Sequence, residues 1–477
     1  MFSEKLLVLL VTFSKYDLNR FRKFLLSPYF NEQEELVKLF DLCNAAIRKG
    51  GEELDALDKN TVWRNMFAGQ PYDDARLRRL ASDLTQMALE FKALEIRARQ
   101  PVQEWLDLQK ALDQPELSKH LSGVERQIRK LMEEDQMPAT TYYLTGFQMH
   151  WNIFNRASKV VSNTDFMQKL LPADEFLDSF YIVQKLKFYV SWLIYRGFRA
   201  TEAELMVPQG FWEYLQNERF ARIPVVIVYR KIILMLLEPD DEEKFYDLLD
   251  TIERFVNDIQ EVDRRECYYI AQNYCAFKLN QGKIKYYREV FEIFKRIIRQ
   301  NLLIEDGKLS EAVYKNIITS SLQVGEYAWA ENFIQEYSSY LPSDVRDNAR
   351  TFNLANLYWH QKDYNRVIEL LRDVEYNDVV YSLGAKFILV RTFYELGEWL
   401  ALDSLIDSFR IFLRRNKVIS KNLKREYNNF LNFVKRLTTL DPRDEKAIAG
   451  FRRRVMAASA NTPKKWLLEK IEAIEKR

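Results

Sequence analysis

A three-residue motif recurs three times in the second half of the chain, and its spacing restricts what the chain can fold into. The motif stands at Gly325-Glu326-Tyr327, at Lys362-Asp363-Tyr364 and at Gly397-Glu398-Trp399, so its copies lie 37 and then 35 residues apart. A period of this length is typical of a helix–turn–helix unit that cannot bury its apolar face alone and stacks on a neighbouring unit. The motif therefore predicts an array of helical hairpins.

The composition favours helix along the whole chain. Only 13 glycines and 12 prolines occur among 477 residues, so the residues that punctuate strands and tight hairpins are scarce. Apolar residues make up 47% of the chain, which suffices for an extensive core. Because the length exceeds what one hydrophobic core commonly supports, we expect an all-α protein with several domains or an elongated array.

The best-formed unit resembles the tetratricopeptide repeat. In that family a glycine lies between two helices, an aromatic residue follows it by two positions, an alanine comes three residues later, and a proline ends the repeat. Four residues match in this order: Gly325, Tyr327, Ala330 and Pro342. The next two units have Lys362 in place of the first glycine, and Val367 and Leu402 in place of alanine. The resemblance covers residues 311–410 and implies a right-handed solenoid of helical hairpins.

Amphipathic segments in pairs extend this pattern towards the N-terminus. Breaks 42 or 43 residues apart fall at Gly197, Pro239, Gly282 and Gly325. The apolar spacing predicts helices over residues 140–158, 174–196, 201–218 and 224–237 among others. We therefore expect an N-terminal helical block over 1–115, an α-solenoid of irregular hairpins over 116–447, and capping helices over 448–477.

The resemblance also implies a binding groove, because the first helices of tetratricopeptide hairpins line a groove that holds a partner. The groove positions here are Lys315, Thr319, Asn353, Asn356, His360, Arg391 and Glu395. Some family members clamp a partner's C-terminal carboxylate with Lys, Asn and Arg side chains. Lys315 and Asn353 match that clamp, whereas Thr319, Gly384 and Ile388 depart from it. The expectation is a non-catalytic scaffold that holds a protein or peptide partner.

The C-terminal end of the chain is basic. The net charge of the whole chain is +2, yet residues 410–477 hold 19 Lys and Arg against 7 Asp and Glu. The basic end consists of Arg414, Arg415, Lys417, Lys421, Lys424, Arg425, Arg452, Arg453 and Arg454. Such asymmetry indicates an anionic partner, although solvated basic helix faces also keep proteins soluble. The alternative function is therefore a regulatory nucleic-acid-binding protein that uses this end or the N-terminal block.

The N-terminal block has a pattern that allows a DNA-reading interpretation. Asn31 is expected to cap a helix from Glu32, and a short helix over 60–67 precedes a long one over 73–99. Arg76, Arg78 and Arg79 stand near the start of the long helix, where a recognition helix contacts base edges. Because the helix is longer than a reading helix and acids are frequent around it, ordinary packing is the main expectation.

Motifs for catalysis, metals or cofactors are absent from the sequence. His120, His150 and His360 are isolated, and the three cysteines have neither zinc spacing nor the pattern of a disulfide framework. We expect no enzyme activity, no metal and no cofactor; a catalytic site assembled from distant residues is the third alternative. The apolar run over residues 6–11 is too short to span a membrane, so a buried first helix and a cytoplasmic protein are expected.

Overall fold

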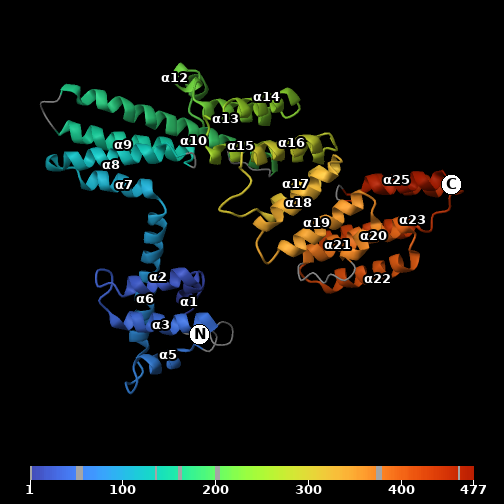
Figure 1. Cartoon of the computed structure of the whole chain (residues 1–477), viewed down its shortest axis with the longest axis horizontal. Coiled ribbons are helices and arrows are strands. Elements are labelled where there is room, and N and C mark those ends of the chain that lie inside the picture. The colour runs from blue at the N-terminus through green and yellow to red at the C-terminus, as the bar shows by residue number, and fades with distance from the viewer. Residues whose placement is uncertain are drawn as a thin grey trace. The chain divides into compact units, whose positions relative to one another are not determined.

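The computed structural model describes residues 3–49, 57–134, 137–159, 164–198, 205–371, 379–459 and 462–476. Within these ranges the regular structure is helical, apart from one isolated β-bridge between Glu305 and Lys308. The prediction of an all-α protein is confirmed. The chain forms two compact units, Met1–Ile182 and Val183–Arg477, and the division falls inside α10 (Leu170–Phe198), which continues through the predicted break at Gly197 (Figure 1).

The first unit begins with a bundle whose helices all pack against α6. Its elements are α1 (Glu4–Val11), α2 (Lys15–Leu25), α3 (Glu34–Lys49), α5 (Lys59–Met66) and α6 (Asp74–Ala98). The core of the bundle contains a cluster of phenylalanines, among them Phe13, Phe21, Phe40 and Phe91. Leu6, Leu7 and Leu10 of α1 are buried in the same core, as expected for the apolar N-terminal run.

The predicted cap at Asn31 is wrong. α3 begins at Glu34, and the Asn31 amide instead donates to the carbonyl of Leu25 at 2.8 Å while its oxygen accepts from the Gln33 N–H at 3.0 Å. Asparagine side chains bond readily to backbone groups two residues away, which favours a turn over a helix start. The capping box of this bundle lies at Ser14 and Asp17, at the start of α2.

A second core follows within the first unit. It is formed by α7 (Pro101–Ala111), α8 (Ser118–Met132) and α9 (Ala139–Ser158), which pack on one another. Leu106 of α7 belongs to this core together with Ile128 and Met149. α7 lies within the predicted N-terminal block over 1–115, is buried with α8 and α9, and also contacts α6. The boundary at residue 115 stays a prediction.

In the second unit, the segment that follows α10 differs from the prediction. The predicted helix over 201–218 is absent from 205–210, and two short helices follow, α11 (Phe211–Tyr214) and α12 (Glu218–Ala221); residues 201–204 lie outside the described ones. Pro208 interrupts a helix, and Gly210 has a φ of 80°, which only glycine adopts at little cost.

Within the described residues, five helical hairpins then follow in sequence. They pair α13 (Pro224–Leu237) with α14 (Glu242–Arg254), α15 (Glu261–Asn280) with α16 (Tyr286–Arg299), α17 (Glu311–Gln323) with α18 (Tyr327–Tyr337), α19 (Arg346–His360) with α20 (Tyr364–Leu371), and α21 (Val379–Leu396) with α22 (Trp399–Arg415). First helices also contact one another, since α13 packs on α15, α17 on α19 and α19 on α21. The hairpins lie in order along the chain (Figure 1).

Four of the hairpin turns have the same backbone conformation. One or two residues after the end of the first helix, each turn has a residue with positive φ: Gly282 (83°), Gly325 (81°), Lys362 (62°) and Gly397 (71°). The next residue donates its N–H to the carbonyl five residues earlier, at 2.9 to 3.1 Å. This is the Schellman arrangement that ends a helix. Lys362 therefore takes the same left-handed conformation as the glycines that it replaces in the sequence motif.

The C-terminal helices complete the core of the second unit. α23 (Lys421–Leu437), α24 (Glu445–Met456) and α25 (Lys464–Glu475) share one hydrophobic cluster with α21 and α22. Trp466, Leu467 and Ile471 of α25 are buried in that cluster. No helix within the described ranges combines the length and the apolar character that a membrane crossing requires.

Candidate partner-binding surfaces

The residues predicted for the groove differ in accessibility along α17 and α19. Lys315 is exposed, and its ammonium lies 5.7 Å from the centre of the Phe352 ring. Thr319 and Asn356 are half-buried. Asn353 is only 1% exposed, and its amide donates to the Ala349 carbonyl at 2.7 Å. Asn353 therefore packs inside its own hairpin and does not face solvent.

The part of the predicted groove on α21 is covered by α25. Glu395 accepts hydrogen bonds from the Trp466 indole N–H at 2.5 Å and from the Lys470 ammonium at 2.7 Å. The Trp466 ring also lies edge-on to Tyr394, with centroids 5.3 Å apart. No residue of α21 from 381 to 395 is exposed. Since α25 is part of the same chain, this end of the groove is closed without a partner.

Arg391 and His360 lie beneath this cover. The Arg391 guanidinium stacks on the rings of Trp359, at 3.8 Å, and Phe387, at 4.6 Å, and no carboxylate within the described ranges forms an ion pair with it. Burial lowers the pKa of Arg391 to about 9. Burial also lowers the pKa of His360 to about 4, helped by the nearby charges of Arg391 and Lys465. These two side chains contribute to packing between α19, α21 and α25.

The first helices α15 and α17 carry accessible side chains at the position that is closed on α21. Ala276 lies six residues before Gly282, the same distance as Thr319 before Gly325 and Arg391 before Gly397. Tyr269 stands two helical turns before Ala276 and so shares its face. Tyr269 is 62% exposed. On α13 the equivalent position is the buried Ile233, and the next residue, Leu234, is 41% exposed. We call Leu234, Tyr269, Ala276, Lys315 and Thr319 the open face.

The α13 and α15 members of the open face were not among the residues predicted from the sequence. The repeat motif was recognised only from residue 311 onwards, because α15 carries no family aromatic and alanine pattern after Gly282. Counting back from Gly282 by the spacing of the later units would have found Ala276 and Tyr269. The spacing from Gly282 therefore pointed to Ala276 and Tyr269, whereas the residue types of α15 did not.

The basic end contains one ordered, uncompensated cationic turn between α22 and α23. Its exposed members are Arg414, Arg415, Lys417 and Lys421, and none of them forms an ion pair or side-chain hydrogen bond within the described residues. Ile419 is 6% exposed and holds the turn to the core, while Ser420 accepts from the Leu423 N–H at 3.2 Å. The turn therefore exposes four basic side chains that have no counter-charge within the described residues. Lys424 is half-buried, and Arg425 donates to Asn422 at 2.7 Å.

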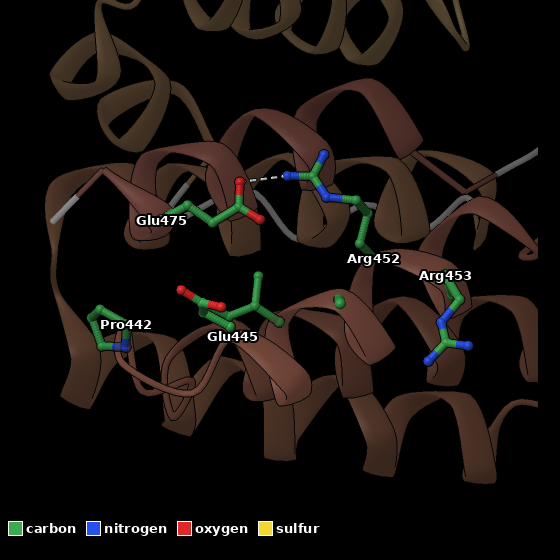
Figure 2. Close-up of a pocket in the computed structure, with 7 residues that line it drawn as sticks. Pro442, Glu445, Arg452, Arg453 and Glu475 are labelled. Carbon is green, nitrogen blue, oxygen red and sulfur yellow. Dashed lines mark hydrogen bonds and ion pairs between the residues drawn. The ribbon is translucent and has the colours of Figure 1, made fainter.

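The second part of the basic end is partly neutralised. Figure 2 shows Arg452 bonded to Glu475 at the edge of a hollow of about 540 Å³ between α24 and α25. The ion pair measures 2.6 Å, and Glu472 lies 3.8 Å from the same guanidinium. Glu445 adds another carboxylate to the hollow, while Arg453 points away from the Arg452–Glu475 pair (Figure 2). This mixed-charge hollow does not suit a polyanion.

The arginines of the N-terminal bundle are engaged in local ion pairs. Arg76 donates to Glu35 at 2.6 Å, and Arg78 pairs with Asp74 at 2.9 Å. Arg79 remains exposed. Two of the three side chains that a DNA-reading helix would offer are therefore bound to carboxylates, which weakens that interpretation.

Chemically reactive groups are buried or dispersed. Cys43, Cys267 and Cys275 are free and buried, and burial raises the pKa of the Cys43 thiol to about 12. His150 stacks on the Phe176 ring at 5.5 Å, and burial lowers its pKa. Across the described ranges, no three His, Cys, Asp or Glu side chains gather as a metal site would need.

Comparison of the chain with protein-family models, with curated proteins and with solved structures found no match. We therefore infer a function from the geometry of the open face and of the cationic turn. Both surfaces belong to the second unit, and each is described by the contacts within that unit.

Proposed function

We propose that this protein is a non-catalytic, tetratricopeptide-like helical scaffold that holds a protein partner on the open face. The observation that carries the proposal is the exposure of large apolar side chains on consecutive first helices, Leu234 on α13 and Tyr269 on α15. On α21 the equivalent face is covered by α25. Large apolar side chains that are exposed to solvent on one surface are typical of protein interaction sites.

The repeat assignment is supported by the turns. Gly282, Gly325, Lys362 and Gly397 share one left-handed conformation and one hydrogen-bond pattern. Ala330, Val367 and Leu402, which occupy the same position in their units, are all buried, at 1% exposure or less. A right-handed solenoid would follow from such equivalent units, as the family resemblance implies.

The open face favours a partner segment with both apolar and acidic side chains. Tyr269 offers an aromatic surface, and Lys315 on the next first helix offers an exposed ammonium. Because Asn353 is buried and bonded to Ala349, the clamp for a C-terminal carboxylate is not part of the proposal. An internal segment of a partner, bound through side chains, fits the face better. The three free cysteines support a cytoplasmic location for this scaffold.

The test compares partner recovery by wild type and by the double variant Tyr269→Glu with Lys315→Glu. We expect the double variant to lose the partners that wild type retains, because a charge on the aromatic contact and a reversed charge on α17 both oppose the proposed segment. Tyr16→Glu is the matched control, since Tyr16 is 67% exposed and belongs to the first unit. An unchanged partner list in the double variant would contradict the open face.

A second candidate function is binding of nucleic acid through the cationic turn. The specific observation is the absence of counter-charges at Arg414, Arg415, Lys417 and Lys421 within the described residues. Four phosphate contacts predict that the logarithm of affinity for duplex DNA falls with the logarithm of salt with a slope of about −4. Arg414→Glu with Arg415→Glu should abolish retention on DNA, whereas Arg453→Glu with Arg454→Glu should not. Free passage of wild type at low salt would exclude this candidate.

A further inference from the structure

A pocket in the second unit lies beside the open face and has no role in the fold described so far. It has a volume of about 300 Å³. Its lining includes Tyr189 of α10, Trp212 of α11 and Leu215 directly after α11, and Arg230, Ile233 and Leu234 of α13. The floor is closed, since Leu215 is 1% and Ile233 4% exposed. The walls are apolar and open, with Trp212 at 42% and Leu234 at 41%.

The aromatic wall of this pocket is held in place before any partner binds. Gly210 turns the chain into α11 with its positive φ, and the neighbouring Phe211 is 4% exposed and anchors the helix. The Trp212 ring meets the Tyr189 ring edge-on at 5.2 Å, and Tyr189 in turn contacts Trp192 at 5.5 Å. Rigid aromatic walls of this kind reduce the entropy that binding costs.

Arg230 is the charged member of the lining, and its charge is uncompensated. Within the described ranges no carboxylate pairs with it and no side-chain hydrogen bond engages it. The adjacent Lys231 differs, because its ammonium donates to Asp247 at 2.5 Å. A free guanidinium at the edge of an apolar pocket complements a carboxylate attached to an apolar group.

We propose that this pocket, which we call the Trp212 pocket, binds one large apolar side chain of a partner protein whose neighbouring aspartate or glutamate pairs with Arg230. The inference rests on the proposed function, because Leu234 belongs both to the pocket and to the open face. A volume of about 300 Å³ is at the small end for ligand pockets and suits a single anchoring side chain. A polyanion is disfavoured by the apolar walls, and a cationic group by Arg230.

The test uses a small probe with the proposed chemistry on the full-length protein. 3-Phenylpropionate carries an aromatic ring and a carboxylate, and 3-phenylpropionamide is its neutral match. With 5-fluorotryptophan in the protein, the Trp212 signal is assigned by its loss in Trp212→Phe. We expect 3-phenylpropionate to shift the Trp212 signal with a millimolar Kd, and the amide to bind about three- to tenfold more weakly.

Arg230→Met keeps the aliphatic stem and removes the charge, so it should bring the Kd of the acid to that of the amide. Lys231→Met is the control and should leave both constants unchanged. Equal binding of acid and amide to wild type, or no shift of the Trp212 signal at 20 mM probe, would overturn the proposal. A Trp212 signal that shifts with protein concentration alone would assign the pocket to a second copy of the chain and also overturn it. The probe needs no partner, so these results are independent of the partner-recovery test of the open face.

Discussion

Acidification should destabilise the protein through His360, and the expected size follows from the surroundings of this side chain. His360 at the end of α19 lies among Arg391 of α21, Lys465 of α25 and the ring of Tyr327, which is 6.4 Å away. Burial and the two cations lower its pKa from 6.5 to about 4. The folded protein therefore keeps His360 neutral, while the unfolded chain takes up the proton first.

The sign and the magnitude follow from proton linkage. Because the folded pKa lies below the unfolded one, the free energy of unfolding falls as the pH drops from about 6.5 to about 4 and changes little from this group outside that window. One pKa unit corresponds to about 1.4 kcal/mol, so the full loss is about 3 kcal/mol, of which about 2 kcal/mol appears by pH 5. His360→Gln removes the titrating group and should flatten this part of the pH dependence.

The assay is urea unfolding of the full chain, followed by circular dichroism at pH 7.5, 6 and 5. The difference in unfolding free energy between wild type and His360→Gln should change by about 2 kcal/mol between pH 7.5 and pH 5. His120→Gln is the control, since His120 is exposed, and it should follow wild type at each pH. Parallel pH profiles for wild type and His360→Gln would refute the reasoning, because they would mean that His360 becomes protonated in the folded state.

Four further substitutions test the packing and the turns, each by urea or thermal unfolding. Ala330→Leu inserts a branched side chain at a position with 0% exposure and should cost about 1–3 kcal/mol; an unchanged melting temperature would contradict the assigned register. Gly384→Ala places a Cβ 2.5 Å from the Phe352 ring and should destabilise by a similar amount, whereas Gly123→Ala, with open space around it, should stabilise by about 0.5–1 kcal/mol. Lys362→Gly should stabilise by up to about 1 kcal/mol because it relieves a left-handed backbone at 62°, and a loss of stability would show that the lysine side chain has a role of its own.

The local features of the fold could be read from the sequence. The glycine motif located the turns at Gly325 and Gly397, and α13 has the bounds that the apolar spacing predicted. Lys362 shows where prediction from residue type fails. Its position in the repeat requires a left-handed conformation, which lysine does not favour. The absence of a helix over 205–210 shows a second failure of prediction. The apolar spacing favoured a helix there, although Pro208 and Gly210 oppose one.

The candidate site could be predicted only in part, because accessibility depends on contacts far apart in sequence. Glu395 lies where a groove residue is expected, yet Lys470 and Trp466 bind it from α25, more than 70 residues later. Nothing in the spacing of α21 signals that cover. Tyr269 and Trp212 were missed for the opposite reason, since an exposed aromatic residue on a helix looks the same in sequence as a buried one.

The most direct test of the scaffold proposal is photo-crosslinking from the open face in cells that make the protein naturally. p-Benzoylphenylalanine replaces Tyr269 in one variant and Tyr340, which is 41% exposed and lies after α18, in the other. We expect a discrete crosslinked partner from position 269 and none from position 340. No adduct from position 269, or the same adducts from both positions, would contradict it.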